Sequence, residues 1–297
     1  MVRHGRYAIL VIALNLFTGI SFGQGRPADI AHLQPAEGRA ETGRISVLSY
    51  NVKGVPWPVA WGRDAAMEEI AGRLASSRLR GEQPDIVLLQ EAFTDSAREI
   101  GRRAGYAHIA FGPDASEQAT GHHAPPLGQD WSRGEAMGKP LGSGLAILSD
   151  FPILAVKTLP FGDQACAGFD CLANKGVMMA LVRVPGRREP VRIFNTHLNA
   201  RKASGVPVGK ANLAFRRQLD LLARFIRRAA SPGAYGAISP VIIGGDFNIG
   251  QDEDRVAAFA ALAGTGRLPG FVALSRASGA QLLRRDAIIG DRPRADL

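Results

Sequence analysis

The chain of 297 residues has only two cysteines, Cys166 and Cys171, with four residues between them. No second cysteine pair and no His-x-His pattern accompanies them, so the sequence gives no support for a structural zinc site. No cysteine lies near the N-terminal segment either, which argues against a lipid-anchored form. The two cysteines could instead form a single disulfide if the protein is exported to an oxidising compartment.

Histidine is also scarce. The chain has six histidines, and none follows His197. His122 and His123 are adjacent, but Pro125 and Pro126 follow closely, and a solvated loop explains this setting better than a metal site does. No internal repeat and no low-complexity block occurs after residue 43, which excludes repeat architectures.

An apolar run at residues 8–17 stands near the N-terminus and is too short to span a membrane comfortably. Arg3 and Arg6 precede it, and the small residues Ser21 and Gly23 follow it. This order predicts a secretory signal peptide over residues 1–23, and therefore a secreted or periplasmic protein. An uncleaved N-terminal anchor is the alternative.

After the signal peptide, residues 24–43 are rich in Pro, Ala, Gly and Glu and are expected to form a flexible leader. Residues 44–297 are expected to form one folded domain. The formal net charge is +9, and it falls to +7 without Arg3 and Arg6. This charge favours anionic partners, either nucleic acid or an acidic membrane surface.

Within this domain, short apolar runs typical of strands alternate with helical stretches. The expected strands cover residues 45–51, 85–91, 144–149, 176–184, 191–197 and 241–246. Because several strands follow one another without a helix between them, the expected fold is α/β (α+β), with mixed sheets and helices on their outer faces. The segment 112–143 contains many Gly and Pro residues and predicts a long loop, either functional or disordered.

Apolar periodicity predicts two helices. Asp64 could cap the first, in which Met67, Ile70 and Leu74 share one face. The second covers about residues 210–230, with an apolar stripe on one side and arginines on the other. The stripe consists of Phe215, Leu219, Leu222 and Ile226, and the arginines are Arg216, Arg217, Arg224, Arg227 and Arg228. We expect these arginines to form a solvated face rather than a binding site.

Four of the expected strands end in polar side chains that suit phosphate-ester chemistry. Asn51 ends the first strand and Glu91 the second, His197 ends a later one, and Asp246 and Asn248 follow the last. Strand ends are where a sheet presents chemistry to a ligand. The two glycines before Asp246 let the backbone approach that ligand. Asp-x-Asn alone could equally cap a turn, but the four strand ends together indicate hydrolysis of a phosphodiester with a hard metal ion.

The ordered segments that carry these residues resemble the endonuclease/exonuclease/phosphatase superfamily, which includes deoxyribonuclease I and the bacterial neutral sphingomyelinases. The resemblance extends from about Ile45 to Asn248. Its segments are Ser-Tyr-Asn-Val-Lys-Gly, Pro-Asp-Ile-Val-Leu-Leu-Gln-Glu-Ala-Phe, Gly-Ser-Gly-Leu-Ala-Ile-Leu-Ser, Asn-Thr-His-Leu-Asn-Ala and Gly-Asp-Phe-Asn. The resemblance implies a four-layer α/β/β/α sandwich and a metal-dependent phosphodiesterase.

The resemblance also implies roles for the strand-end residues. Glu91 would hold a divalent cation, Mg²⁺ in the first place and Mn²⁺ or Ca²⁺ as alternatives, and Asn51 would be a metal or phosphate ligand beside it. Asp246 would orient the attacking water or its base, and Asn248 would donate to the phosphate. His197 would contact the phosphate and protonate the leaving oxygen.

One segment points to a branch of the superfamily. Asn174-Lys175-Gly176 is similar to the Asn-Lys-Gly segment of the sphingomyelinase branch. Lys175 could contact the phosphate, although a solvated lysine after a turn is equally expected. The expected substrate is therefore a sphingomyelin-type phospholipid headgroup, with peripheral membrane contact. A secreted nuclease acting on nucleic acid is the alternative. The sequence does not indicate an oligomeric state.

The family pattern closes with Ser-Asp-His on the last strand, where the histidine activates water, and this chain has no histidine after His197. The expected domain is therefore short at its C-terminus, either because the reading frame is truncated or shifted near residue 275 or because this is a natural short form. Loss of a general base lowers a rate by about 10²–10⁴-fold. A catalytically silent family member is a further alternative.

Overall fold

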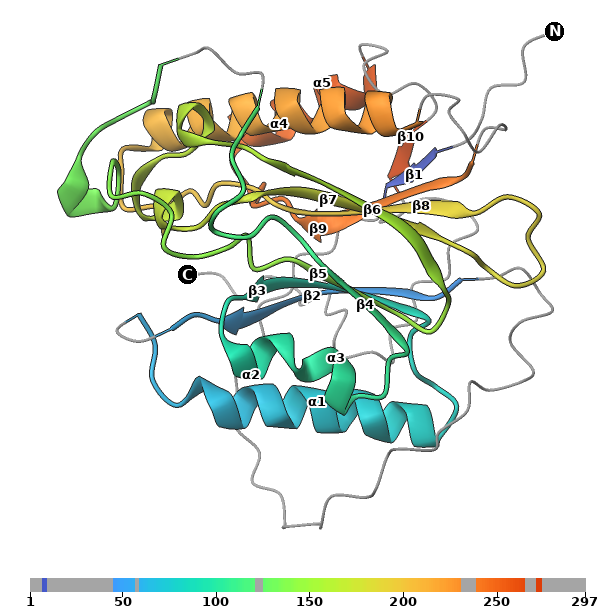
Figure 1. Cartoon of the computed structure of the whole chain (residues 1–297). Coiled ribbons are helices and arrows are strands. Elements are labelled where there is room, and N and C mark those ends of the chain that lie inside the picture. The colour runs from blue at the N-terminus through green and yellow to red at the C-terminus, as the bar shows by residue number, and fades with distance from the viewer. Residues whose placement is uncertain are drawn as a thin grey trace, which may run out of the picture.

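The protein is seen in a computed structural model that describes residues 7–9, 45–56, 59–120, 125–230, 239–264 and 271–273. These residues form four layers, in which two β-sheets face each other and helices cover both outer faces (Figure 1). The expected α/β/β/α sandwich with mixed sheets is therefore confirmed. The predicted leader at residues 24–43 and the pair His122–His123 lie outside the described residues.

The smaller sheet has four strands in the order β2-β3-β5-β4. They are β2 (Val47–Gly54), β3 (Ile86–Ala92), β5 (Ala146–Ser149) and β4 (His108–Phe111). β2 and β3 are parallel, and β5 is antiparallel to both of its neighbours. Its outer face is covered by α1 (Arg63–Leu79), α2 (Asp95–Arg98) and α3 (Ile100–Arg103) (Figure 1).

The larger sheet has six strands in the order β10-β1-β9-β8-β7-β6. Its main strands are β6 (Ile153–Pro160), β7 (Gly176–Val182), β8 (Val191–His197) and β9 (Val241–Asp246). β8 and β9 are parallel, and their register places His197 directly beside Asp246. The outer face is covered by α4 (Val208–Ala230) and α5 (Glu253–Gly264) (Figure 1).

Two short strands complete the larger sheet. β1 (Tyr7–Ile9) lies between β9 and β10 (Phe271–Ala273) and is parallel to both. β1 belongs to the segment expected to be a signal peptide, and that signal peptide stays a prediction. No helix within the described ranges is long and apolar enough to cross a membrane.

Three apolar cores hold the four layers together. Ile86, Leu88 and Ile147 of the smaller sheet meet Met178 and Ile193 of the larger one between the sheets. One outer core joins the larger sheet to α4 and α5, and the other joins the smaller sheet to α1, α2 and α3. Residues of β3 alternate between two of these cores, because successive side chains of a strand point to opposite faces. This explains why the buried strands read as continuous apolar runs.

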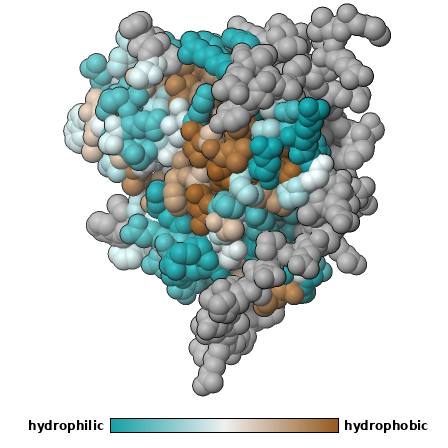
Figure 2. Space-filling model, turned by 45° about the vertical axis from the view of Figure 1, so that its right-hand side comes forward, coloured by the Kyte–Doolittle hydropathy of each residue, from teal (hydrophilic) through white to brown (hydrophobic). Residues whose placement is uncertain are grey.

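All six expected strands form, within a few residues of their expected ends. β4, β6 and the short strands β1 and β10 are not among the expected strands. β4 has four residues, and β6 is an edge strand that pairs only with β7 and leaves Leu154 and Val156 exposed. Figure 2 shows apolar surface gathered in the middle of the face turned toward the viewer, between hydrophilic regions. A half-exposed edge strand has no strong apolar pattern, which is why sequence reasoning missed it.

The two expected helices form as α1 and α4. In α4, the stripe of Phe215, Leu219, Leu222 and Ile226 is buried, as expected. In α1, Asp64 does not cap the helix. The N-cap position is Gly62, which has a left-handed backbone, and Asp64 lies in the first turn and accepts a hydrogen bond from Ser96 Oγ at 2.6 Å.

The expected long loop at residues 112–143 is ordered by specific contacts in its described parts. Asn174 Nδ2 donates to the carbonyls of Asp114 and Glu117 at 2.7 and 2.9 Å. The buried Glu135 accepts from Gly168 N at 2.8 Å and pairs with Lys210 of α4 at 2.7 Å. A carboxylate with these partners ties the loop to the body of the protein.

Replacing Asn195, which is fully buried between the sheets, should destabilise the fold. Its Oδ1 accepts from Gln90 Nε2 at 2.8 Å, and its Nδ2 donates to the carbonyls of Leu89 and Ala146 at 2.8 and 2.9 Å. Asn195→Ala removes these three buried hydrogen bonds and should lower the free energy of unfolding by about 3 kcal/mol. Chemical denaturation measures this, with Gln118→Ala, an exposed amide, as the control. Equal losses in both variants would contradict the expectation.

Candidate active site

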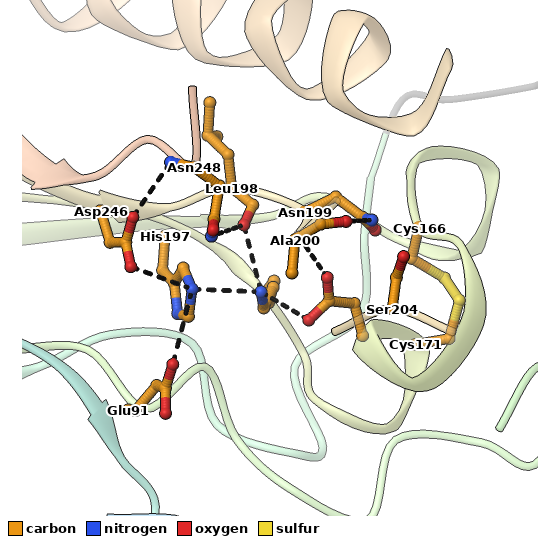
Figure 3. Close-up of polar contacts among 12 residues, drawn as sticks. Glu91, Cys166, Cys171, His197, Leu198, Asn199, Ala200, Ser204, Asp246 and Asn248 are labelled. Atoms are coloured by element: carbon orange, nitrogen blue, oxygen red, sulfur yellow. Dashed lines mark hydrogen bonds and ion pairs between the residues drawn. A yellow bond between two sulfur atoms is a disulfide. The ribbon is translucent and has the colours of Figure 1, made fainter. Parts of the chain in front are cut away.

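Polar side chains from both sheets converge at the carboxyl ends of the central strands. Asn51 comes from β2, Glu91 from β3, His197 from β8 and Asp246 from β9. One ligand atom each of Glu91, His197 and Asp246 lie within 4.8 Å of one another. Figure 3 shows both carboxylates directed at the same nitrogen of the His197 imidazole. The strand-end residues predicted from the sequence are therefore brought together.

Asn51 connects the carboxylates of the two sheets. Its Nδ2 donates to Glu91 Oε1 at 2.7 Å and to Asp246 Oδ2 at 3.0 Å. Its Oδ1 accepts from the backbone N–H of Lys53 at 3.0 Å. The amide nitrogen, not the oxygen, therefore faces the carboxylates in this structure, and a metal-ligand role for Asn51 stays a prediction.

The backbone at Glu91 has an unusual conformation that orients its side chain. Its φ is 56°, in the left-handed region that residues other than glycine rarely adopt. The pairing of β2 with β3 shifts register between Asn51 and Gly54, beside it. A Cβ at Gly54 would lie 2.8 Å from the Glu91 carbonyl, so only glycine leaves room for this backbone. Such strain is typical of functional positions.

Asp246 is held ionised at the end of β9. Burial alone would raise the pKa of its carboxyl, but His197 and hydrogen bonds from Asn51 and the backbone N–H of Asn248 outweigh burial and lower that pKa. The preceding Gly245 is required, since a Cβ there would lie 2.0 Å from the Thr196 carbonyl. An ionised carboxylate at this position can hold a cation or orient water.

His197 is buried, and its Nε2 faces the charged groups of the site. Nε2 lies 3.9 Å from Glu91 Oε1, 3.8 Å from Asp246 Oδ2 and 3.3 Å from Lys175 Nζ. Nδ1 is buried without a hydrogen-bond partner among the described residues. Burial, followed by the positive charge of Lys175, lowers the pKa of His197 below its ordinary value. The imidazole is therefore neutral at neutral pH.

Lys175 was expected either to contact phosphate or to be solvated, and the structure instead buries its ammonium group among protein atoms. Its Nζ is buried and contacts Asp170 Oδ1 at 2.7 Å, the Leu198 carbonyl at 3.1 Å and His197 Nε2. These three contacts use the three N–H donors of the ammonium group. Lys175 therefore contacts His197 and lowers its pKa, and the three contacts leave the ammonium group no N–H for phosphate.

Asn248 faces the site through its backbone as well as its side chain. Its N–H donates to Asp246 Oδ1 at 3.0 Å, and its Nδ2 donates to the Leu198 carbonyl at 2.9 Å (Figure 3). Its φ of 50° is left-handed, a conformation that asparagine tolerates better than most residues. One side-chain N–H has no role in these bonds, so the expected donation to phosphate stays a prediction.

Sequence reasoning missed Asp170, which pairs with Lys175 and accepts a hydrogen bond from the backbone N–H of Ala200. It lies in the short helix η4 (Gly168–Leu172), between the two cysteines, which form a disulfide (Figure 3). In the sequence, this segment stands out only for its cysteines. An acidic residue five positions before Lys175 is the one sequence feature that could indicate the ion pair.

The donor set fits a divalent cation. Glu91 and Asp246 supply carboxylate oxygens, whereas the single lone pair of His197 Nε2 accepts from the Lys175 ammonium. Two carboxylates that face one another are stabilised by a shared cation. Carboxylate oxygens are the preferred ligands of Mg²⁺ and Ca²⁺.

Comparison with known proteins agrees with this geometry. The profile of the endonuclease/exonuclease/phosphatase family matches residues 48–285. The chain belongs to this family. The earlier resemblance is thereby confirmed, and the family is one of phosphodiester hydrolases. No curated protein sequence matches the chain.

Solved structures share the fold of this family member. Sphingomyelinase C from Streptomyces griseocarneus is 24% identical, with a TM-score of 0.53 over 73% of this chain and 68% of that one. A β-hairpin deletion mutant of beta toxin from Staphylococcus aureus is 20% identical, with a TM-score of 0.53 over 74% and 73%. A double mutant of the same toxin with bound magnesium ions is 19% identical, with a TM-score of 0.53 over 72% and 69%.

Removing the ammonium behind His197 should raise the pKa of the imidazole. In Lys175→Met, the positive charge that lowers this pKa is gone, and Asp170 is left without its partner, which acts in the same direction. NMR titration of the metal-free protein measures it. The exposed Lys157→Met is the control and should leave the His197 titration unchanged. A pKa of His197 that falls or stays constant in Lys175→Met would contradict the electrostatic role of Lys175.

Proposed function

We propose that this protein is an exported, Mg²⁺-dependent phosphodiesterase that hydrolyses a sphingomyelin-type phospholipid. The observation that carries the proposal is the convergence of Glu91, Asp246 and His197 at the strand ends of a family member. Two carboxylates and an imidazole in one site match the needs of phosphodiester hydrolysis, where negative charge must be neutralised and protons moved.

Glu91 and Asp246 would hold the metal ion. A divalent cation bound there would neutralise the charge that builds on the phosphoryl oxygens during hydrolysis. Magnesium is proposed because the ligands are carboxylate oxygens and because the beta toxin structure with a similar fold contains magnesium ions. Mn²⁺ and Ca²⁺ accept similar ligands and are the alternatives.

The other side chains would position substrate and water. Asp246, ionised because of its lowered pKa, can accept a hydrogen bond from the attacking water. Asn248 would donate its remaining side-chain N–H to the phosphate. His197 would contact the phosphate and protonate the leaving oxygen, a role that requires its Nε2 to carry a proton when the substrate is bound. His108 is the other histidine in the described ranges, and it lies on β4, away from these residues.

Exposed aromatic side chains support a lipid substrate over nucleic acid. Trp61 follows β2 and is 78% exposed, and Trp131 lies in the long loop and is 74% exposed. Phe169 on η4 is also exposed, next to Asp170. In Figure 1, the loop after β2 and the green segment between β4 and β5, to which Trp131 belongs, reach the same left-hand end of the sandwich. Tryptophan at a protein surface suits the interface of a membrane, which favours peripheral contact with a lipid bilayer.

Export is proposed from the N-terminal sequence and is supported by the Cys166–Cys171 disulfide. Disulfides persist in the periplasm and outside the cell, and they are rare in the cytosol. Both features favour a protein that acts after secretion or in the periplasm.

The substrate can be tested with the purified protein and Mg²⁺ on sphingomyelin vesicles and on plasmid DNA. We expect release of phosphocholine from the vesicles, and Glu91→Ala should lower its rate by at least about 10²-fold, as loss of a metal ligand does. Glu69→Ala, at an exposed carboxylate of α1, is the matched control and should keep the wild-type rate.

The other outcomes separate the alternatives. Cleavage of plasmid DNA without phosphocholine release would show a nuclease. Turnover of neither substrate, with Mg²⁺ still bound, would show a catalytically silent family member.

A further inference from the structure

Arg255 is the largest fully buried side chain in the described part of the chain, and it lies in the first turns of α5. Burying a guanidinium group is costly unless its charge and its N–H groups are compensated. Among the described residues, no carboxylate hydrogen-bonds this guanidinium, although the nearby Asp252 carboxylate favours its charge. The Phe215 ring lies 4.6 Å from its central carbon and compensates part of its charge. Such a group is unusual in a core and calls for a reason.

The hydrogen bonds of Arg255 lead to the backbone of the site. Nη1 donates to the carbonyl of Asn199 and to the carbonyl of Asn248, each at 2.7 Å. Nε donates to Asn212 Oδ1 of α4, also at 2.7 Å. A single nitrogen therefore joins two chain segments, Nε is anchored to α4, and Nη2 is buried without a hydrogen-bond partner among the described residues.

These two carbonyls occupy equivalent places in the site. Asn199 stands two residues after His197, and Asn248 stands two residues after Asp246, on the neighbouring parallel strand. Between them, Leu198 N donates to the Asp246 carbonyl at 2.9 Å, and Asn248 Nδ2 donates to the Leu198 carbonyl. Arg255 thus closes the ladder of β8 and β9 beyond the point where the strands end.

The contact fixes Asn248 in its left-handed conformation. The N–H of Asn248 is held by Asp246, its side-chain amide by Leu198, and its carbonyl by Arg255. Without the last bond, the peptide that follows Asn248 could rotate. Its side-chain amide and the N–H that holds Asp246 Oδ1 would then lose their fixed directions.

We infer that Arg255 is a positioning residue of the site, which fixes Asn248 and Asp246 relative to His197 by bridging the backbone carbonyls of Asn199 and Asn248. The inference rests on the proposed function only for its effect on turnover. Its effect on the backbone can be measured in the protein without metal or substrate.

A purely structural role for a buried arginine is the competing explanation, and Arg78 provides the matched control. Arg78 is buried on α1, stacks at 4.6 Å on the Tyr106 ring and donates through Nε to the Ala104 carbonyl at 2.9 Å. Unlike Arg255, it also forms an ion pair, with Asp150. α1 lies in the opposite helical layer of the sandwich (Figure 1). Arg78→Lys therefore makes the same chemical change away from the site.

The test compares Arg255→Lys with Arg78→Lys. In metal-free protein, amide hydrogen exchange by NMR should show the N–H groups of Asn248 and Leu198 exchanging at least about 10-fold faster in Arg255→Lys, because local opening frees them. Arg78→Lys should leave both unchanged. On the phosphodiester substrate, kcat should fall about 10–100-fold in Arg255→Lys with KM nearly constant, as when a supporting residue of a site is lost.

Equal exchange at Asn248 in Arg255→Lys and wild-type protein would overturn the inference, whatever the activity. If the wild-type protein shows no hydrolysis and the exchange effect is nevertheless found, the proposed function fails and the positioning role stands. If Arg255→Lys does not fold, Asn212→Ala serves instead, since it removes the Nε acceptor and keeps the guanidinium. It should accelerate exchange at Asn248 by a smaller factor, and no acceleration would again overturn the inference.

Discussion

Two carboxylates carried by different sheets, Glu91 and Asp246, both accept a hydrogen bond from the amide nitrogen of Asn51. Like charges at such proximity repel each other unless positive groups or hydrogen-bond donors face them. The sandwich supplies such groups at increasing distance from the carboxylates. Asn51 lies between the carboxylates, His197 faces both of them, and Lys175 stands behind His197 with its own partner, Asp170. The rest of the fold serves to bring these strand ends together.

The supporting groups are buried and polar, which makes their exact placement important. Asn195 and Gln90 join the two sheets beneath the site, and Arg255 joins the two strand-end segments beside it. Each is enclosed by apolar cores, where hydrogen bonds are strong and an unpaired group is costly. These hydrogen bonds fix the strand ends, although Gln90 Oε1 and Arg255 Nη2 have no partner among the described residues.

Much of this architecture could be predicted from the sequence, because the inner strands are buried on both faces and read as apolar runs. Asn51, Glu91, His197 and Asp246 could be found because each follows such a run. The partners of Lys175 could not, since its contacts with Asp170 and Leu198 depend on loops that fold back over 5 and 23 residues. Arg255 reads in the sequence as an ordinary surface arginine of a helix, and only the packing of α5 on α4 reveals its burial. Asp64 was misplaced because Gly62 provides the N-cap through its backbone conformation alone.

We propose that Glu91 and Asp246, from opposite sheets, share one divalent cation. Crystals of the protein can be soaked in Mn²⁺ and measured at an X-ray energy where manganese scatters anomalously. We expect an anomalous peak in contact with both carboxylates, and its loss in crystals of Asp246→Asn. A well-ordered site without a peak between Glu91 and Asp246, at a Mn²⁺ concentration that supports turnover, would contradict it.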